Sequence, residues 1–518
     1  MSNNNTGVRT YGGWRKPVSP GLMGMGLAPS LLLFAGLPTT LFLGVRAGWT
    51  AAAVLFLVLA ALGSPMVFKN RAGRTGWQIL GSRFAWTFGK WGGSNVYRSG
   101  LAGSVVRGEH RLPGLLASTQ AVDIASAMGE RAAMLHIKRR SHFSVCIALE
   151  PEGVQLVDRA TVDTRVDEWA RFLTNLGYEP GLVGATAVFD ISPDPGTRLG
   201  AEVARITRDD VPEFAKAMMA EAAATYPVGG AQTHAHVALT YSGQAKVSSE
   251  GEGLLGRRRS VDEATVSRQP GEMAVEIGRR LGELRAELRA SGARWTRLMT
   301  VEAAAEFVRG AYDPESAEKI AVLRAGGGEP GVAWSDAGPT AAVESWSSYR
   351  HDSGLSVVWE MVDVPKSAVT ADVLKALLAP HPDVARKRVA LTYRPLDPAQ
   401  AATVVDRSLR TAISRTGRRR GLAYAADTQD LAQAKRMASE EAAGAGVTRL
   451  SMIVTATVAD PAKLPAAVRA VEQTALGSRI RLRRMYAGQA AGFAAGLGMG
   501  VVLPAWGNPA LAWLRTNS

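Results

Sequence analysis

Two long uncharged runs near the amino terminus constrain this chain more than any other feature. Residues 21–45 and 47–68 contain no charged side chain, and only Arg46 separates them. Each run exceeds the ~20 residues that a helix needs to cross a ~30 Å hydrocarbon layer. The pattern predicts two antiparallel transmembrane helices over 21–68, with Arg46 and Trp49 at the turn between them. A single span would bury Arg46, and a secretory signal peptide would need a cleavage site that the run lacks.

The distribution of charge predicts how this hairpin lies. Eleven of the 60 Lys and Arg residues precede Glu109, the first acidic residue, so most of the net charge of +14 belongs to the first fifth of the chain. Lys69, Arg71 and Arg74 follow the second run, and three further basic residues precede the first. Positive residues favour the cytoplasmic side, so we expect a two-span protein of the cell membrane with both termini and its soluble domains in the cytoplasm. Confined in this way, the basic charge favours contact with the lipid bilayer over nucleic acid.

The segment after the hairpin has the pattern of an amphipathic helix. Trp77, Leu80, Phe84 and Phe88 recur at helical spacing, with basic residues between them. The pattern predicts a helix that lies in the membrane interface. The alternative is an ordinary helix that packs on the soluble domain.

The rest of the chain predicts an α+β fold in two related halves. Strand-like and helix-like segments alternate from "HFSVCIALE" to "RWTRLMT", and the same order returns from "GLSVVWEMV" to "RIRLRRMY". Each half reads as a split-βαβ (ferredoxin-like) unit with an inserted helix. Long polar loops are expected at 243–268 and 324–340. The predicted divisions are a basic cytoplasmic amino terminus (1–20), the hairpin (21–68), a juxtamembrane segment (69–112), and two α+β domains (113–310 and 311–518).

A search for catalytic or cofactor motifs finds only weak candidates. "GEGLLG" at 251–256 has the GxGxxG spacing but lies in a polar loop rather than between a strand and a helix, and no Walker A sequence occurs. His234 and His236 share one strand face without an evident third metal ligand. His351 and Asp352 could form an acid–base pair, although Asp and Gly there more simply form a turn. We therefore expect no enzyme activity, no metal and no cofactor.

Two arginine runs and one cysteine complete the set of candidate residues. Arg257, Arg258 and Arg259 form the first run, and Arg418, Arg419 and Arg420 form the second. Without interleaved aromatic residues they are typical of solvated loops, with contact to an anionic partner or a DNA backbone as the alternative. Cys146 is the only cysteine and lies in an apolar strand pattern, so we expect a buried, unreactive thiol.

Several longer stretches are distinctive, among them "EPGLVGATAVFDISPDPGTRL", "ESWSSYRHDSGLSVVWEM", "LLAPHPDVARKRVALTYRPLDPA" and "RMYAGQAAGFAAGLGMGVVLP". They resemble a family of actinobacterial two-span membrane proteins associated with conjugation-like, type IV-related secretion loci. More distantly, the hairpin and the paired halves look like the E subunit of type VII secretion (EccE-like). The resemblance implies a membrane-anchored subunit that works beside a separate secretion ATPase and other membrane subunits. It supplies no catalytic residues.

Together these observations predict a non-catalytic structural subunit of a cell-envelope secretion or conjugal DNA-transfer machine, in a homo- or hetero-oligomer. One alternative is a type VII secretion E-type component. Another is a membrane-tethered nucleic-acid-binding protein, which would use the arginine runs.

Overall fold

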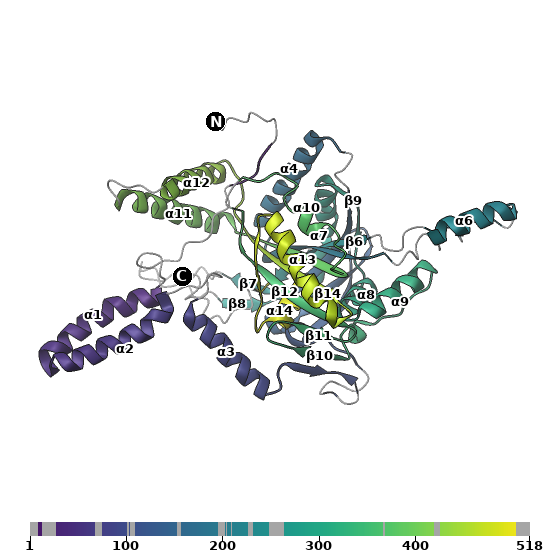
Figure 1. The fold of residues 1–518 in the computed structure, drawn as a ribbon. Coiled ribbons are helices and arrows are strands. Elements are labelled where there is room, and N and C mark those ends of the chain that lie inside the picture. Colours follow the sequence, from purple (N-terminus) through teal and green to yellow (C-terminus); the bar gives the residue numbers. More distant parts are fainter. Residues whose placement is uncertain are drawn as a thin grey trace.

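The structure is a computed structural model of the chain, drawn in Figure 1. The residues that it describes are 9–12, 27–67, 75–100, 103, 109–152, 157–194, 203, 205–208, 210–225, 231–247, 264–365, 368–418 and 425–503.

A single antiparallel sheet of 13 strands forms the centre of the molecule. Its strands are β1 (Val96–Arg98), β2 (Thr119–Ala125), β3 (Arg131–Ile137), β4 (His142–Pro151), β5 (Leu182–Pro193), β6 (Ala231–Ser242), β9 (Ala293–Leu298), β10 (Ala341–Glu344), β11 (Tyr349–His351), β12 (Gly354–Asp363), β13 (Arg386–Pro395), β14 (Thr448–Val458) and β15 (Arg481–Arg484). A separate two-stranded ribbon joins β7 (Gln244–Val247) to β8 (Ala264–Ser267) within the predicted loop 243–268. The described parts of the chain are therefore α+β, as expected.

The strand order shows two units of the same topology. In the first, β9, β4, β6 and β5 are neighbours in that order, and in the second β15, β12, β14 and β13 are. Numbered along the chain, each unit has the order 4-1-3-2 of a split βαβ unit. The two units share one sheet because β5 pairs with β13, with Val188 opposite Ala390 at the middle of the register. The predicted boundary between 310 and 311 falls inside α8 (Val301–Tyr312).

Helices cover both faces of this sheet. The first face carries α4 (Arg159–Asn175), α7 (Pro270–Ala290), α10 (Lys375–Leu378) and α13 (Leu464–Gly477). The second face carries α8 and α14 (Gln489–Gly496), and α9 (Pro314–Ala325) packs against α8. Amphipathic sequences account for this arrangement: α7, for example, buries Ile277, Leu281, Leu284 and Leu288 at helical spacing. The sheet is thus the middle layer of three.

Other helices extend away from these layers. Figure 1 shows α6 (Glu213–Thr225) on one side, and the pair α11 (Pro398–Arg418) and α12 (Ala425–Ala442) on the other. Each follows the second strand of its unit, as predicted for the inserted helices. The amino-terminal helices α1 (Leu27–Ala47) and α2 (Trp49–Val67) form a third extension.

The predicted transmembrane hairpin is wrong, although two antiparallel helices do form. They turn at Gly48, whose φ of +94° favours glycine. Nevertheless, in the part of the chain that the structure describes, no helix has the length and apolar character that crossing a membrane requires. The prediction counted uncharged residues, but α1 contains Pro38, Thr39 and Thr40, and the last turns of α2 contain Gly63, Ser64 and Pro65. The assignment to the cell membrane with two spans is therefore withdrawn.

The chain segment that follows α14, around Gly498 and Gly500, crosses the second face and packs against strands of the first unit. Gly498 and Gly500 have φ of +66° and +88°. A Cβ on Gly500 would lie 2.8 Å from Ser144 Cβ on β4 and 2.9 Å from the Ile137 side chain on β3. Only glycine permits both this conformation and this close approach.

We therefore expect Gly500→Ala to lower the free energy of unfolding by about 2–5 kcal/mol, since backbone strain and steric overlap both act there. Gly114→Ala is the matched control, because Gly114 also has a positive φ (+61°) but has open space around its Cα. It should cost only about 1–2 kcal/mol. Urea denaturation measures both values, and equal losses would contradict the proposed contact.

Candidate functional site

Two places in the structure collect chemically distinctive side chains. One is a buried polar cluster where the two units meet, and the other is the surface of the amino-terminal helices. The first contains the histidine candidates from the sequence, and the second contains the interface candidates.

The buried cluster lies at one end of the β5–β13 junction. Asp190 on β5 stands directly opposite Arg388 on β13, and both are almost completely buried. Arg386 Nη2 donates to Asp190 Oδ2 at 2.5 Å, and Arg388 Nε lies 3.6 Å from Asp190 Oδ1. The opposite end of the junction carries a hydrogen bond between the Thr186 and Thr392 hydroxyls (3.1 Å) in place of an ion pair.

One carboxylate therefore balances two guanidinium groups in the interior. Burial opposes the charge of Asp190, but Arg386 and Arg388 hold the pKa of this carboxyl well below its usual range. The Arg388 guanidinium lies over the rings of Phe307 (5.4 Å) and Phe493 (5.5 Å), so π electrons supply part of its stabilisation. Burial lowers the pKa of Arg388 to about 10, which keeps it charged at neutral pH.

The histidine candidates have structural partners around this cluster. His236 is buried, and its Nε2 lies 3.2 Å from the Leu497 carbonyl oxygen. His234 is opposite Asp190 in the strand register and is exposed. Among the described residues, no group of three or more His, Cys, Asp and Glu side chains could hold a metal ion. The geometry thus gives His236 a role in attaching the segment after α14.

His351 and Asp352 face different partners. The buried His351 ring bridges the Tyr312 carbonyl (2.5 Å) and the Ser356 hydroxyl (2.7 Å). Asp352, in the turn between β11 and β12, accepts hydrogen bonds from the backbone amides of Thr340 (2.9 Å) and Ala341 (3.1 Å) at the start of β10. The two side chains therefore do not form the acid–base pair that the sequence suggested, and Asp352 connects its turn to β10.

Cys146 lies beside this cluster on the second face. It is buried, its Sγ is 3.7 Å from the Gly498 carbonyl oxygen, and burial raises its pKa to about 12. A thiol with this pKa stays protonated, so the residue is unreactive, as expected.

The remaining sequence candidates fall on the amino-terminal helices or outside the described residues. Arg46 lies in the last turn of α1, exposed, with its guanidinium 5.8 Å from the Phe42 ring centre, and Trp49 is exposed at the start of α2. Arg418 is the last residue of α11. The others lie outside the described residues, as does the GxGxxG frame at 251–256: Lys69, Arg71, Arg74, Arg257, Arg258, Arg259, Arg419 and Arg420.

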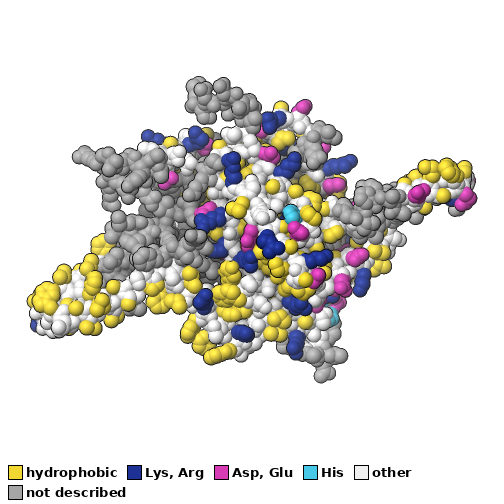
Figure 2. Space-filling model, viewed as in Figure 1, with side chains coloured by type: hydrophobic (Ala, Val, Ile, Leu, Met, Phe, Trp, Pro, Cys, Tyr) yellow, Lys and Arg dark blue, Asp and Glu magenta, His cyan; other side chains and the backbone are white. Residues whose placement is uncertain are grey.

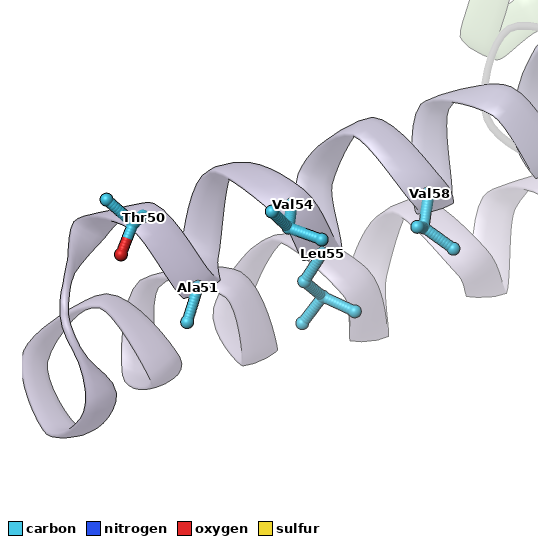
Figure 3. A pocket seen from close by; sticks show the side chains of 5 residues that line it. All are labelled: Thr50, Ala51, Val54, Leu55 and Val58. Carbon is cyan, nitrogen blue, oxygen red and sulfur yellow. The ribbon is translucent and has the colours of Figure 1, made fainter.

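The amino-terminal helices expose many large apolar side chains. On α1 and α2, Phe42, Trp49 and Leu57 are each about two-thirds exposed (64%, 69% and 66%). Figure 2 shows hydrophobic side chains over most of this extension, whereas charged side chains gather on the body of the molecule. Figure 3 shows a shallow apolar hollow along α2, where Thr50, Val54 and Val58 follow one another at successive turns and Ala51 and Leu55 lie beside them. Patches of this kind mark surfaces that other molecules cover.

α3 (Gly76–Trp91) continues this surface and also attaches to the sheet edge. A capping box at Thr75 and Gln78 starts the helix. Phe84, Phe88 and Trp91 form an exposed aromatic stripe, with ring centres 4.8 and 5.8 Å apart. From the same helix, Trp86 packs against Trp346 at 5.9 Å. Contact with the soluble domain, the alternative considered from the sequence, is therefore present.

The sequence reasoning missed Asp190, Arg386 and Arg388, together with Trp86 and Trp346. The signal for the first three was a charged residue at inward positions of apolar strands, in "AVFDIS" and "RKRVAL". Neither tryptophan carries such a signal, since their contact depends on how α3 meets the sheet.

We expect Asp190→Asn to lower the free energy of unfolding by about 3–5 kcal/mol, because it leaves the buried Arg388 and the partly buried Arg386 without their counter-charge. Asp123→Asn is the matched control, since Asp123 pairs with Arg131 on the exposed surface (3.1 Å) and should cost under about 1 kcal/mol. Urea denaturation at neutral pH compares them. A loss below that of the control would show that the junction does not depend on the ion pair.

The buried histidines predict a loss of stability in mild acid. Burial lowers the pKa of His142, His236 and His351 to about 4, whereas unfolded histidine has a pKa of about 6.5. Below pH ~6.5 the unfolded chain therefore binds more protons, and stability falls by up to about 4 kcal/mol per pH unit. His351→Gln should reduce this slope by about a third, measured by urea denaturation between pH 7 and pH 5. An unchanged slope would contradict the burial of a neutral His351.

Residues 18–78 match the model of a domain of unknown function (DUF8461), which covers α1, α2 and the start of α3. No curated protein matches the chain.

Proposed function

We propose that this chain is a non-catalytic structural subunit of a larger protein assembly, and that α1–α3 carry its docking surface. One observation supports this above all: the apolar surface of these helices extends from a sheet whose two faces are already covered by helices of the same chain. Large exposed apolar side chains lower their free energy when a partner covers them. A surface of this kind suits a docking role better than a catalytic one.

The resemblance described above supplies the partner to test first. It implies a subunit beside a separate secretion ATPase in a conjugation-like or type VII-like machine. Attachment to a lipid bilayer forms no part of the proposal.

Site-specific photo-crosslinking tests the proposal in the organism that makes the protein. A photoreactive phenylalanine analogue replaces Phe42 on α1 or Phe84 on α3, which are 64% and 68% exposed. We expect light-dependent adducts of the full chain that mass spectrometry identifies as the secretion ATPase or another subunit of the same machine. The control position is Met128, which is 81% exposed at the turn between β2 and β3 and lies outside α1–α3.

Two results would contradict the proposal. One is the absence of adducts at Phe42 and Phe84, or adducts no more specific than those at Met128. The other is turnover of ATP by the purified chain alone. Salt-sensitive retention of the purified chain on DNA would favour the nucleic-acid alternative.

A further inference from the structure

A short segment near the amino terminus, residues 9–12, binds α4 through two side chains. Arg9 donates to both carboxylate oxygens of Asp167, with Nη1 2.8 Å from Oδ2 and Nη2 2.7 Å from Oδ1. The Tyr11 hydroxyl donates to Asp163 Oδ1 at 2.7 Å. Burial and the neighbouring Asp163 raise the pKa of Tyr11 to about 12, so this hydroxyl stays a donor at neutral pH. A bidentate ion pair and a charge-assisted hydrogen bond therefore lie side by side.

The spacing of these residues matches an extended segment to a helix. Alternate residues of an extended segment point to one side and lie ~6.7 Å apart, at ~3.3–3.4 Å per residue. Residues four positions apart on a helix share one face and are separated by ~6 Å along its axis. Arg9 and Tyr11 therefore meet the two α4 carboxylates in pairs. Thr10, which lies between them, is exposed, so the arrangement selects arginine and tyrosine two positions apart.

The backbone of the same segment pairs with the second unit. The Tyr11 amide donates to the Val369 carbonyl at 2.7 Å, and the Val369 amide donates to the Tyr11 carbonyl at 2.8 Å, in an isolated antiparallel bridge. Val369 lies between β12 and α10 of the second unit, whereas α4 belongs to the first. We call the surface formed by Asp163, Asp167 and the Val369 backbone the α4–Val369 site. The bound segment thus connects the two units.

The contacts that hold this segment are accessible to solvent. The side chains of Arg9 and Asp167 are 48% and 45% exposed, and Tyr11 is half-buried. An ion pair this exposed contributes little to stability, and ordering the segment costs conformational entropy. The site can therefore exchange this segment for another that offers the same chemistry.

We propose that the α4–Val369 site docks a partner protein, which binds through an extended segment with arginine and tyrosine two positions apart. Residues 9–12 show the chemistry that the site recognises, and they compete with the partner as an intramolecular ligand. The partner segment adds its backbone to Val369 and releases residues 9–12 from α4. A segment with an acidic residue in place of the arginine would face two carboxylates, which disfavours it. None of these residues lies on α1–α3, so the inference does not rest on the proposed function.

Fluorescence anisotropy of a labelled peptide tests the site on the full chain. The probe is VRTYGG, the sequence of residues 8–13, and its matched control carries citrulline for arginine and phenylalanine for tyrosine. The chain is used as the wild type and as Arg9→Gln/Tyr11→Phe, which weakens the intramolecular ligand. We expect the probe to bind this variant at least about tenfold more tightly than the wild type, because a tethered competitor acts at a millimolar effective concentration.

Substitution of one carboxylate shows whether the peptide binds at α4. Asp167→Asn, added to the Arg9→Gln/Tyr11→Phe chain, should weaken binding at least about tenfold, because it removes the bidentate ion pair. Glu168→Gln in the same chain is the matched control and should leave the affinity unchanged. Glu168 is the next residue of α4 and pairs with Arg171 at 2.8 Å. Equal urea midpoints show that the variants are folded.

The proposal is overturned if the probe binds neither chain, binds both with equal affinity, or binds no better than its citrulline–phenylalanine control. Unchanged affinity after Asp167→Asn would also overturn it. The crosslinks from α1 and α3 test different residues, so failure of either proposal leaves the other intact.

Discussion

The pairing of β5 with β13 is the interaction on which the rest of this structure depends. Each split-βαβ unit ends in an edge strand, and joining the two edges removes rows of unpaired amide and carbonyl groups from both. The junction brings Asp190 against Arg386 and Arg388, and it creates a continuous second face that α8, α14 and the segment around Gly500 can cross. Because that segment starts in the second unit and packs on β3 and β4 of the first, the units cannot separate without exposing a shared core.

The edge of the sheet also fixes the position of α3. Trp346 and Tyr486 follow β10 and β15 at the edge of the second unit, and α3 reaches them through Trp86. α3 is therefore attached to the sheet edge by this contact. This arrangement fits a subunit that presents surfaces to partners.

Local sequence pattern predicted the elements within each unit because their strands alternate and their helices are amphipathic. The repeated order from "HFSVCIALE" and from "GLSVVWEMV" was enough to indicate two similar units. The pattern could not show that they share one sheet, since the register between β5 and β13 depends on contacts about 200 residues apart. The prediction that the two helices span a membrane was wrong, because a run without charge also contains Pro, Thr, Ser and Gly. Trp86 and Trp346 were missed because nothing local marks their contact.

Hydrogen exchange of the native chain tests the shared sheet most directly. If the β5–β13 junction is central, peptides from these two strands exchange as slowly as those from β4 and β12, and only through global unfolding. Exchange from β5 and β13 that is faster than from β4 and β12, with both units otherwise protected, would show that the units separate. That result would contradict the account of a single fused sheet.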